Sequence, residues 1–125
     1  MKSKWCCVVS KQYNNVVVYS NKEWFNDFPV FSNLCGFDEV YDGNYDLSRM
    51  HIHEFIEISI VVEGTGIHLS LDGAERCSVG DVYIINTGVP HNYVNEEAPR
   101  TFAVRNLLFN PAEFFGDDTV FSGNT

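Results

Sequence analysis

The sequence predicts an all-β protein, a sandwich or barrel of short strands built as one domain over residues 1–125. Stretches with the 3.6-residue period of an amphipathic helix are scarce. Runs of β-branched and aromatic residues, broken by Gly, Asn, Asp and Pro, are frequent instead. Residues 51–62 alternate with a period of two, which is typical of a long strand with two different faces.

Before this stretch the pattern is weaker. We expect strands at residues 5–9 and 16–19, with Tyr13-Asn14-Asn15 as a turn between them. Residues 23–47 contain several phenylalanines but no period, so an irregular segment is expected there.

From residue 51 onward the strands follow one another closely. They are expected at residues 51–62, 67–71, 82–86, 91–95 and 100–109. Gly64-Thr65-Gly66 should turn the chain after the first of these, and a turn with Gly88 and Pro90 should precede His91. Asp72-Gly73 is expected to be a two-residue hairpin turn, because both residue types tolerate positive φ.

A short helix is expected near the C-terminus. Asn110 suits the N-cap position and Pro111 the first helical position. The residues after Gly116 are polar and show no periodic pattern, so we expect this sequence to be the N-terminal part of a longer protein.

The charge is strongly negative and unevenly placed. Eight basic and seventeen acidic residues give a net charge of −9, and the four lysines all occur at or before Lys22, whereas every acidic residue occurs at or after Glu23. Such a surface repels phosphate, which argues against nucleic-acid or anionic-membrane binding by this chain. The sequence shows neither a signal peptide nor an apolar run of about 20 residues, so a cytoplasmic location is expected.

The four cysteines, Cys6, Cys7, Cys35 and Cys77, have neither the spacing of a zinc site nor that of a disulfide framework. We interpret them as reduced thiols that act as small apolar residues.

The alternation over residues 51–62 produces two rows of side chains. One row reads Ile52, Glu54, Ile56, Ile58, Ile60, Val62, and we expect its apolar residues to pack in the core beneath some covering element. The other row reads His51, His53, Phe55, Glu57, Ser59, Val61. Imidazoles and a carboxylate side by side are costly to bury unless they are paired, hydrated or metal-bound.

A third histidine, His91, opens a later strand. Together with His51, His53 and Glu57 it makes a ligand set that suits Zn, Ni, Fe or Mn and leaves positions open for another ligand. The alternative is a polar pocket without metal; the filled set of four positions favours the metal. His68 alternates with Ile67 and Leu69, and we expect it on the surface or hydrogen-bonded within the barrel.

Two motifs resemble those of the cupin superfamily. The first is His51-x-His53, three residues, Glu57, six residues and Gly64; the second is Gly80, five residues, Asn86-x-Gly88, two residues, His91, three residues and Asn95. The resemblance implies a double-stranded β-helix, or jelly-roll, barrel.

The stretch from Arg49 to Phe115 resembles more narrowly the N-terminal sensor domain of AraC-family transcription regulators. The segments that carry this resemblance are His51-Ile52-His53-Glu54-Phe55, Val62-Glu63-Gly64-Thr65-Gly66, Gly80-Asp81-Val82-Tyr83-Ile84-Ile85, Pro90-His91-Asn92-Tyr93 and Leu108-Phe109-Asn110-Pro111. It implies a barrel that binds a small effector, often a sugar, at Arg49, Ser59, Tyr93 and Asn106. It further implies that DNA is bound by a helix-turn-helix domain outside this sequence, and it leaves a homodimer open.

Two functions from different classes therefore remain open, and a third, a storage or purely structural cupin, is disfavoured by the length of 125 residues and the filled ligand set. The first is the effector-sensing domain of a transcription regulator, in which no residue is catalytic. The second is a metal-dependent cupin enzyme, such as a sugar isomerase or a dioxygenase, in which the metal acts as a Lewis acid or activates oxygen. No acid or base besides the four candidate ligands stands out, which favours the sensor.

Overall fold

The computed structural model describes residues 11–13, 16–19 and 30–111. The elements of these residues, in chain order, are β1 (Lys11–Tyr13), β2 (Val16–Tyr19), β3 (Val30–Gly36), the 3-10 helix η1 (Leu47–Arg49), β4 (His51–His53), β5 (Ile56–Glu63), β6 (Thr65–Ser70), β7 (Gly73–Ser78), β8 (Val82–Ile85), β9 (His91–Asn95) and β10 (Ala103–Phe109). None of the described residues belongs to a helix long and apolar enough to cross a membrane.

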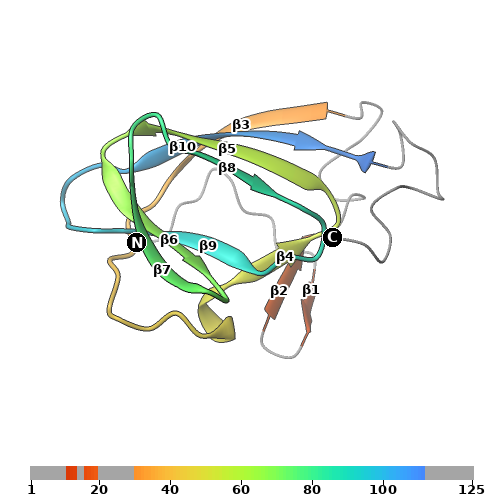
Figure 1. Ribbon diagram of the computed structural model, residues 1–125, viewed down its shortest axis with the longest axis horizontal. Helices are drawn as coiled ribbons and strands as arrows, with labels where there is room; N and C mark the ends of the chain where they lie inside the picture. Colours follow the sequence, from red (N-terminus) through yellow and green to blue (C-terminus); the bar gives the residue numbers. More distant parts are fainter. Residues whose placement is uncertain (1–10, 14–15, 20–29, 112–125) are drawn as a thin grey trace.

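The strands form two sheets that face each other (Figure 1). One has the order β1-β2-β4-β9-β6-β7 and the other the order β3-β10-β5-β8. Neighbours are antiparallel except for β2 and β4, which run parallel. Non-consecutive neighbours in both sheets are the mark of a jelly roll, so the predicted all-β barrel is confirmed.

Several predicted strands are confirmed and others were missed. Residues 16–19 and 91–95 form β2 and β9, and the last predicted strand is the shorter β10. The prediction of an irregular segment at residues 23–47 is wrong over Val30–Gly36, because β3 pairs with β10 along its whole length. Strand β7 was also not foreseen. The predicted strand at residues 5–9 and the helix beyond Pro111 lie outside the described residues.

The single long strand predicted at residues 51–62 is wrong in one respect. The chain bends at Glu54 and Phe55, so that β4 belongs to one sheet and β5 to the other. The bend is held by the backbone of Gly88, whose N–H donates to the carbonyl of His53 at 2.9 Å. Alternation alone does not distinguish one strand from two that meet at a corner, because the period of two continues through the bend.

The row predicted to be core is the outer one. Ile60 and Val62 expose 39% and 44% of their surface, whereas Glu57, Ser59 and Val61 in the other row are buried. The expectation that the isoleucine row forms the core is therefore wrong. The polar row is buried because its groups bond to one another, which removes most of the cost of taking them out of water.

Two turns also differ in detail from the prediction. Ser70 pairs with Gly73, so the hairpin turn consists of Leu71 and Asp72, and Gly73 with φ 127° begins β7. Gly64 lies in the turn after β5, but Gly66 is part of β6. Glycine is needed at position 66 because a Cβ atom there would overlap the ring of Phe102.

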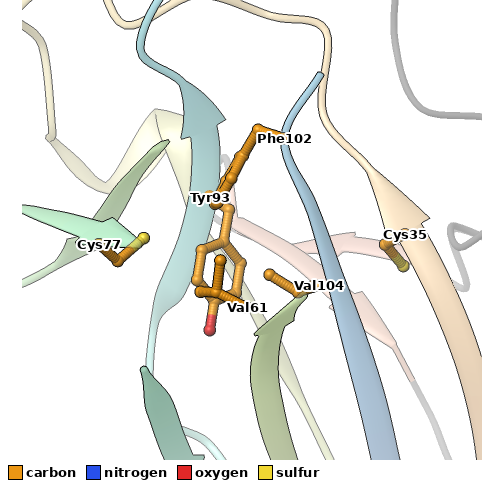
Figure 2. Packing of buried hydrophobic residues seen from close by; sticks show 6 residues of the cluster. All are labelled: Cys35, Val61, Cys77, Tyr93, Phe102 and Val104. Carbon is orange, nitrogen blue, oxygen red and sulfur yellow. The ribbon is translucent and has the colours of Figure 1, made fainter. Parts of the chain in front are cut away.

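Phe102 belongs to a buried cluster between the sheets, shown in Figure 2. Its members are Cys35, Val61, Cys77, Tyr93, Phe102 and Val104. Cys35 and Cys77 are free thiols there, as the sequence predicted. The Tyr93 hydroxyl points away from Phe102 in this view (Figure 2), which leaves a polar atom beside an apolar cluster.

We predict that Gly66→Ala lowers the free energy of unfolding by about 1–3 kcal/mol, because the methyl group overpacks the Phe102 ring. Urea denaturation measures this. In a Phe102→Leu background the same substitution should cost less than half as much, since the smaller side chain can move aside. An equal cost in both backgrounds would show that the ring is not the obstacle.

Candidate functional site

Three histidines from two neighbouring strands meet at one place inside the barrel. His51 and His91 are paired residues of β4 and β9, and His53 lies on the same face of β4 as His51. One ring nitrogen from each of the three lies within 4.8 Å of the others. The sheet register thus assembles the histidines that the sequence predicted as ligands.

His53 is oriented by the bend that follows it. Its Nδ1 lies 2.7 Å from the carbonyl oxygen of Phe55, and its ring stacks on the Phe55 ring with centroids 4.3 Å apart. Because a carbonyl only accepts, Nδ1 donates the proton and Nε2 presents a lone pair in the neutral ring. Nε2 is therefore the atom through which His53 can bind a metal.

His91 lies opposite this lone pair, with 2.9 Å between the two Nε2 atoms. Nitrogens bound to one ion at about 2.1 Å in neighbouring positions lie about 3 Å apart, so the distance fits shared coordination. A hydrogen bond from His91 also fits, but it would leave Nδ1 of His91 deprotonated at 4.0 Å from Glu57 Oε2, without a partner. With metal on Nε2, Nδ1 carries the proton, and the Glu57 carboxylate at 4.0 Å attracts it electrostatically. The residues fit a metal better than a metal-free pair.

Glu57 supplies the negative charge of the site. It is 6% exposed on β5, with Oε1 3.4 Å from Nε2 of His53 and Oε2 accepting a 2.6 Å hydrogen bond from the Ser59 hydroxyl. Burial would raise the pKa of Glu57, but His91, His53 and Ser59 outweigh it and hold that pKa below its usual value. The group is a carboxylate at neutral pH.

Two of the histidines near this carboxylate, His51 and His91, resist protonation. Burial lowers the pKa of His91 well below its usual value, and it lowers the pKa of His51 to about 4 with a smaller contribution from His53. The attraction of Glu57 opposes both shifts without cancelling them. A buried carboxylate beside imidazoles that resist protonation is an environment that a cation stabilises.

Two of the predicted effector residues extend the network from Glu57. Ser59 and Asn106 are paired residues of β5 and β10, both buried, with Oγ and Oδ1 2.7 Å apart. Nδ2 of Asn106 in turn donates to Oδ1 of Asn33 at 3.0 Å. Because the Ser59 hydroxyl has one proton, it can donate to Oε2 of Glu57 or to Oδ1 of Asn106, but not to both at once.

Arg49 and Tyr93 have different surroundings. The guanidinium of Arg49, at the end of η1, pairs with Glu39 at 3.3 Å and Asp42 at 3.0 Å. Tyr93 lies on β9 in the buried cluster, and its ring centroid is 6.4 Å from that of His91. The structure thus groups Tyr93 with the histidines and gives Arg49 acidic partners.

His68 is the residue that sequence reasoning missed. It is 7% exposed on β6 and paired with Tyr93, and its Nε2 has no hydrogen-bond partner, so the expectation of a surface or satisfied residue is wrong. The only sequence signal was its alternation with Ile67 and Leu69. That signal places His68 on one face of its strand, but it does not tell which residue lies opposite it on the neighbouring strand.

Comparisons with solved structures identify the fold. A cupin 2 conserved barrel domain protein from Salinispora arenicola is 16% identical, covers 88% of this chain and 76% of its own, and has a TM-score of 0.56. A sugar phosphate isomerase of the cupin superfamily from Silicibacter pomeroyi is 17% identical, covers 66% and 51%, and has a TM-score of 0.53. At these identities the likeness shows a cupin fold.

Sequence comparison adds the family. The HTH-type transcriptional activator RhaR of Yersinia pseudotuberculosis serotype O:1b (strain IP 31758) is 34% identical over 61 residues, which are 49% of this chain and 20% of that protein. The chain thus matches about a fifth of the length of such relatives. The model of the AraC-like ligand binding domain matches residues 36–117, well over half of the sequence. The chain therefore belongs to the family of AraC-like ligand-binding domains.

Proposed function

We propose that this chain is the effector-sensing domain of an AraC-type transcription regulator and binds a small hydroxyl-rich effector, such as a sugar, inside the barrel. The observation that carries the proposal is a group of polar side chains inside a small barrel. The other buried side chains that the structure describes form an apolar core. Buried imidazole, carboxylate, hydroxyl and amide groups converge there from both sheets. Such a mixture of apolar walls and a few placed polar groups is what small-molecule sites have in common.

In this proposal a divalent ion, Zn, Ni, Fe or Mn, is held by His51, His53 and His91, with Glu57 as the fourth ligand. The short distance between the two Nε2 atoms and the unpaired Nδ1 of His91 support it. When bound, the ion supplies a Lewis-acidic centre for an effector oxygen. The carboxylate balances part of its charge, and the Phe55 carbonyl keeps the ring of His53 in the binding tautomer.

Three residues beside the ion are proposed to contact the effector: Ser59, Tyr93 and Asn106. Ser59 and Asn106 come from the sheet opposite the histidines, so an effector between the sheets would meet polar groups on both sides. Arg49 is a further candidate from the family resemblance. To take part it would have to exchange Glu39 or Asp42 for the effector.

The acidic chain is proposed to leave DNA binding to a helix-turn-helix domain outside these residues, in a cytoplasmic protein that could act as a homodimer. A net charge of −9 supports this division of labour, because it opposes contact with phosphate. The effector would act by binding one arrangement of the regulator more tightly than another.

A metal-dependent enzyme is the second candidate, and the histidine cluster favours it. Three imidazoles and a carboxylate leave coordination positions open for a substrate. The two candidates differ in what happens to a bound compound, because a sensor releases it unchanged.

The metal site predicts stoichiometric binding. After incubation with Zn, Ni, Fe or Mn salts and desalting, elemental mass spectrometry should find about one ion per chain. The double variant His51→Ala, His91→Ala should retain almost none, because two of three imidazole ligands are gone. Glu54→Gln is the matched control: it removes an exposed carboxylate from the same segment and should bind normally. Undiminished metal in the double variant would contradict the site.

The metal-free protein should lose stability as the pH falls from about 6.5 towards about 4. Unfolded histidines take up protons near 6.5, whereas His51 stays neutral in the folded state down to about 4 and His91 also resists protonation. The unfolded state thus binds more protons in this window, which costs on the order of 2 kcal/mol between pH 6.5 and 5. Urea denaturation at several pH values measures the loss. His91→Asn should make the free energy of unfolding depend less steeply on pH. An unchanged dependence would contradict the lowered pKa of His91.

Isothermal titration of the metal-loaded protein with neutral sugars, sugar acids and unrelated metabolites tests the sensor. A neutral sugar should bind, and Asn106→Leu should weaken it about tenfold or more, because a hydrogen-bonding group is lost. Mass spectrometry of the recovered compound should find it unchanged. Metal-dependent conversion would favour the enzyme, and the absence of any binding compound would refute the sensor.

A further inference from the structure

His68 and Tyr93 present two unpaired polar atoms on neighbouring strands. They are register partners on β6 and β9, with ring centroids 5.0 Å apart and exposures of 7% and 3%. Nε2 of His68 and the hydroxyl oxygen of Tyr93 are buried without a hydrogen bond of normal geometry, although the Tyr93 hydroxyl is close enough to the Ser59 hydroxyl to interact with it. Among the described side chains the one other such atom is Nδ1 of His91, which lies 4.0 Å from Oε2 of Glu57.

The fold does not require these two polar atoms. The His68 ring is held by stacking on Tyr83, with centroids 4.1 Å apart and an interplanar angle of 21°. The Tyr93 ring packs on Phe37 and Phe102 at 5.4 and 6.0 Å. Phenylalanine would make the same ring contacts in both places. Burying an unpaired nitrogen and an unpaired hydroxyl is costly and rare, so their retention indicates a missing bonding partner.

We propose that His68 and Tyr93 together bind one hydroxyl group of a neutral, polyhydroxy effector. This inference rests on the proposed function and adds a residue, His68, to its site. A hydroxyl both donates and accepts, and a neutral imidazole nitrogen with a phenol offers one acceptor and one donor.

The electrostatics agree with a neutral ligand. A phenol is uncharged at neutral pH, and burial disfavours the charged form of the His68 imidazole. Glu57 already places a negative charge in the interior and interacts with His68 electrostatically. The pair itself offers no cationic side chain to an anionic group at this position.

Removing either unpaired atom should stabilise the protein without effector. His68→Phe and Tyr93→Phe should each raise the melting temperature by a few degrees, because the ring packing remains and the unsatisfied group is gone. Tyr83→Phe is the matched control. Its hydroxyl donates to Glu75 at 3.1 Å on the exposed side, so this variant should not gain stability.

The same variants should bind a neutral sugar about tenfold or more weakly by isothermal titration. They should also lose most of the wild-type preference for that sugar over the analogue lacking one hydroxyl, which a purely structural role would not alter. Lower melting temperatures in both variants, or unaltered affinity and preference, would overturn the inference. If the wild type binds no compound, the sensor proposal itself fails. If the wild type binds the sugar and both variants bind it with the same affinity and preference, only the His68–Tyr93 contact fails.

Discussion

The corner between β4 and β5 is the constraint on which the rest of the site depends. At Glu54 and Phe55 the chain leaves one sheet and joins the other without changing which row of side chains faces inward. The carbonyl of Phe55 accepts from the His53 ring, and the carbonyl of His53 accepts from the Gly88 backbone. The corner thus ties the histidine strand to the turn before β9, which is the strand that brings His91.

Because both sheets meet at this corner, one short stretch of sequence supplies polar groups to both walls of the barrel. The histidine sheet provides imidazoles, and the opposite sheet provides Glu57, Ser59 and Asn106. The groups on the second wall lie within hydrogen-bond distance of one another, in a chain that runs from Glu57 through Ser59 and Asn106 to Asn33. The first wall is less complete, because it includes all three of the described buried atoms without a partner. This difference is expected if the side chains of the first sheet contact a ligand and those of the second sheet hold the site in place.

The electrostatics of the interior have a similar origin. Interactions with His91, His53 and Ser59 hold the pKa of Glu57 below its usual value, while burial lowers the pKa of His51 and His91. The protein thereby keeps a negative centre and several lone pairs ready in the folded state. Pre-organisation of this kind lowers the cost of binding, since little has to move or change protonation when a ligand arrives. It also costs stability, as binding sites commonly do.

The sequence by itself determined the class of fold and the identity of the histidine cluster. A period of two is a local property of an extended chain, and the spacing from His51 to Glu57 is enough to place those residues on one row. The local pattern could not decide which row faces inward, because both rows alternate equally well and only contact with a second sheet distinguishes them. It also could not reveal β3, whose pairing with β10 joins residues far apart in the chain. For the same reason His68 was misjudged: its partner across the sheet, Tyr93, is set by strand register, and strand register is decided only when the tertiary structure forms.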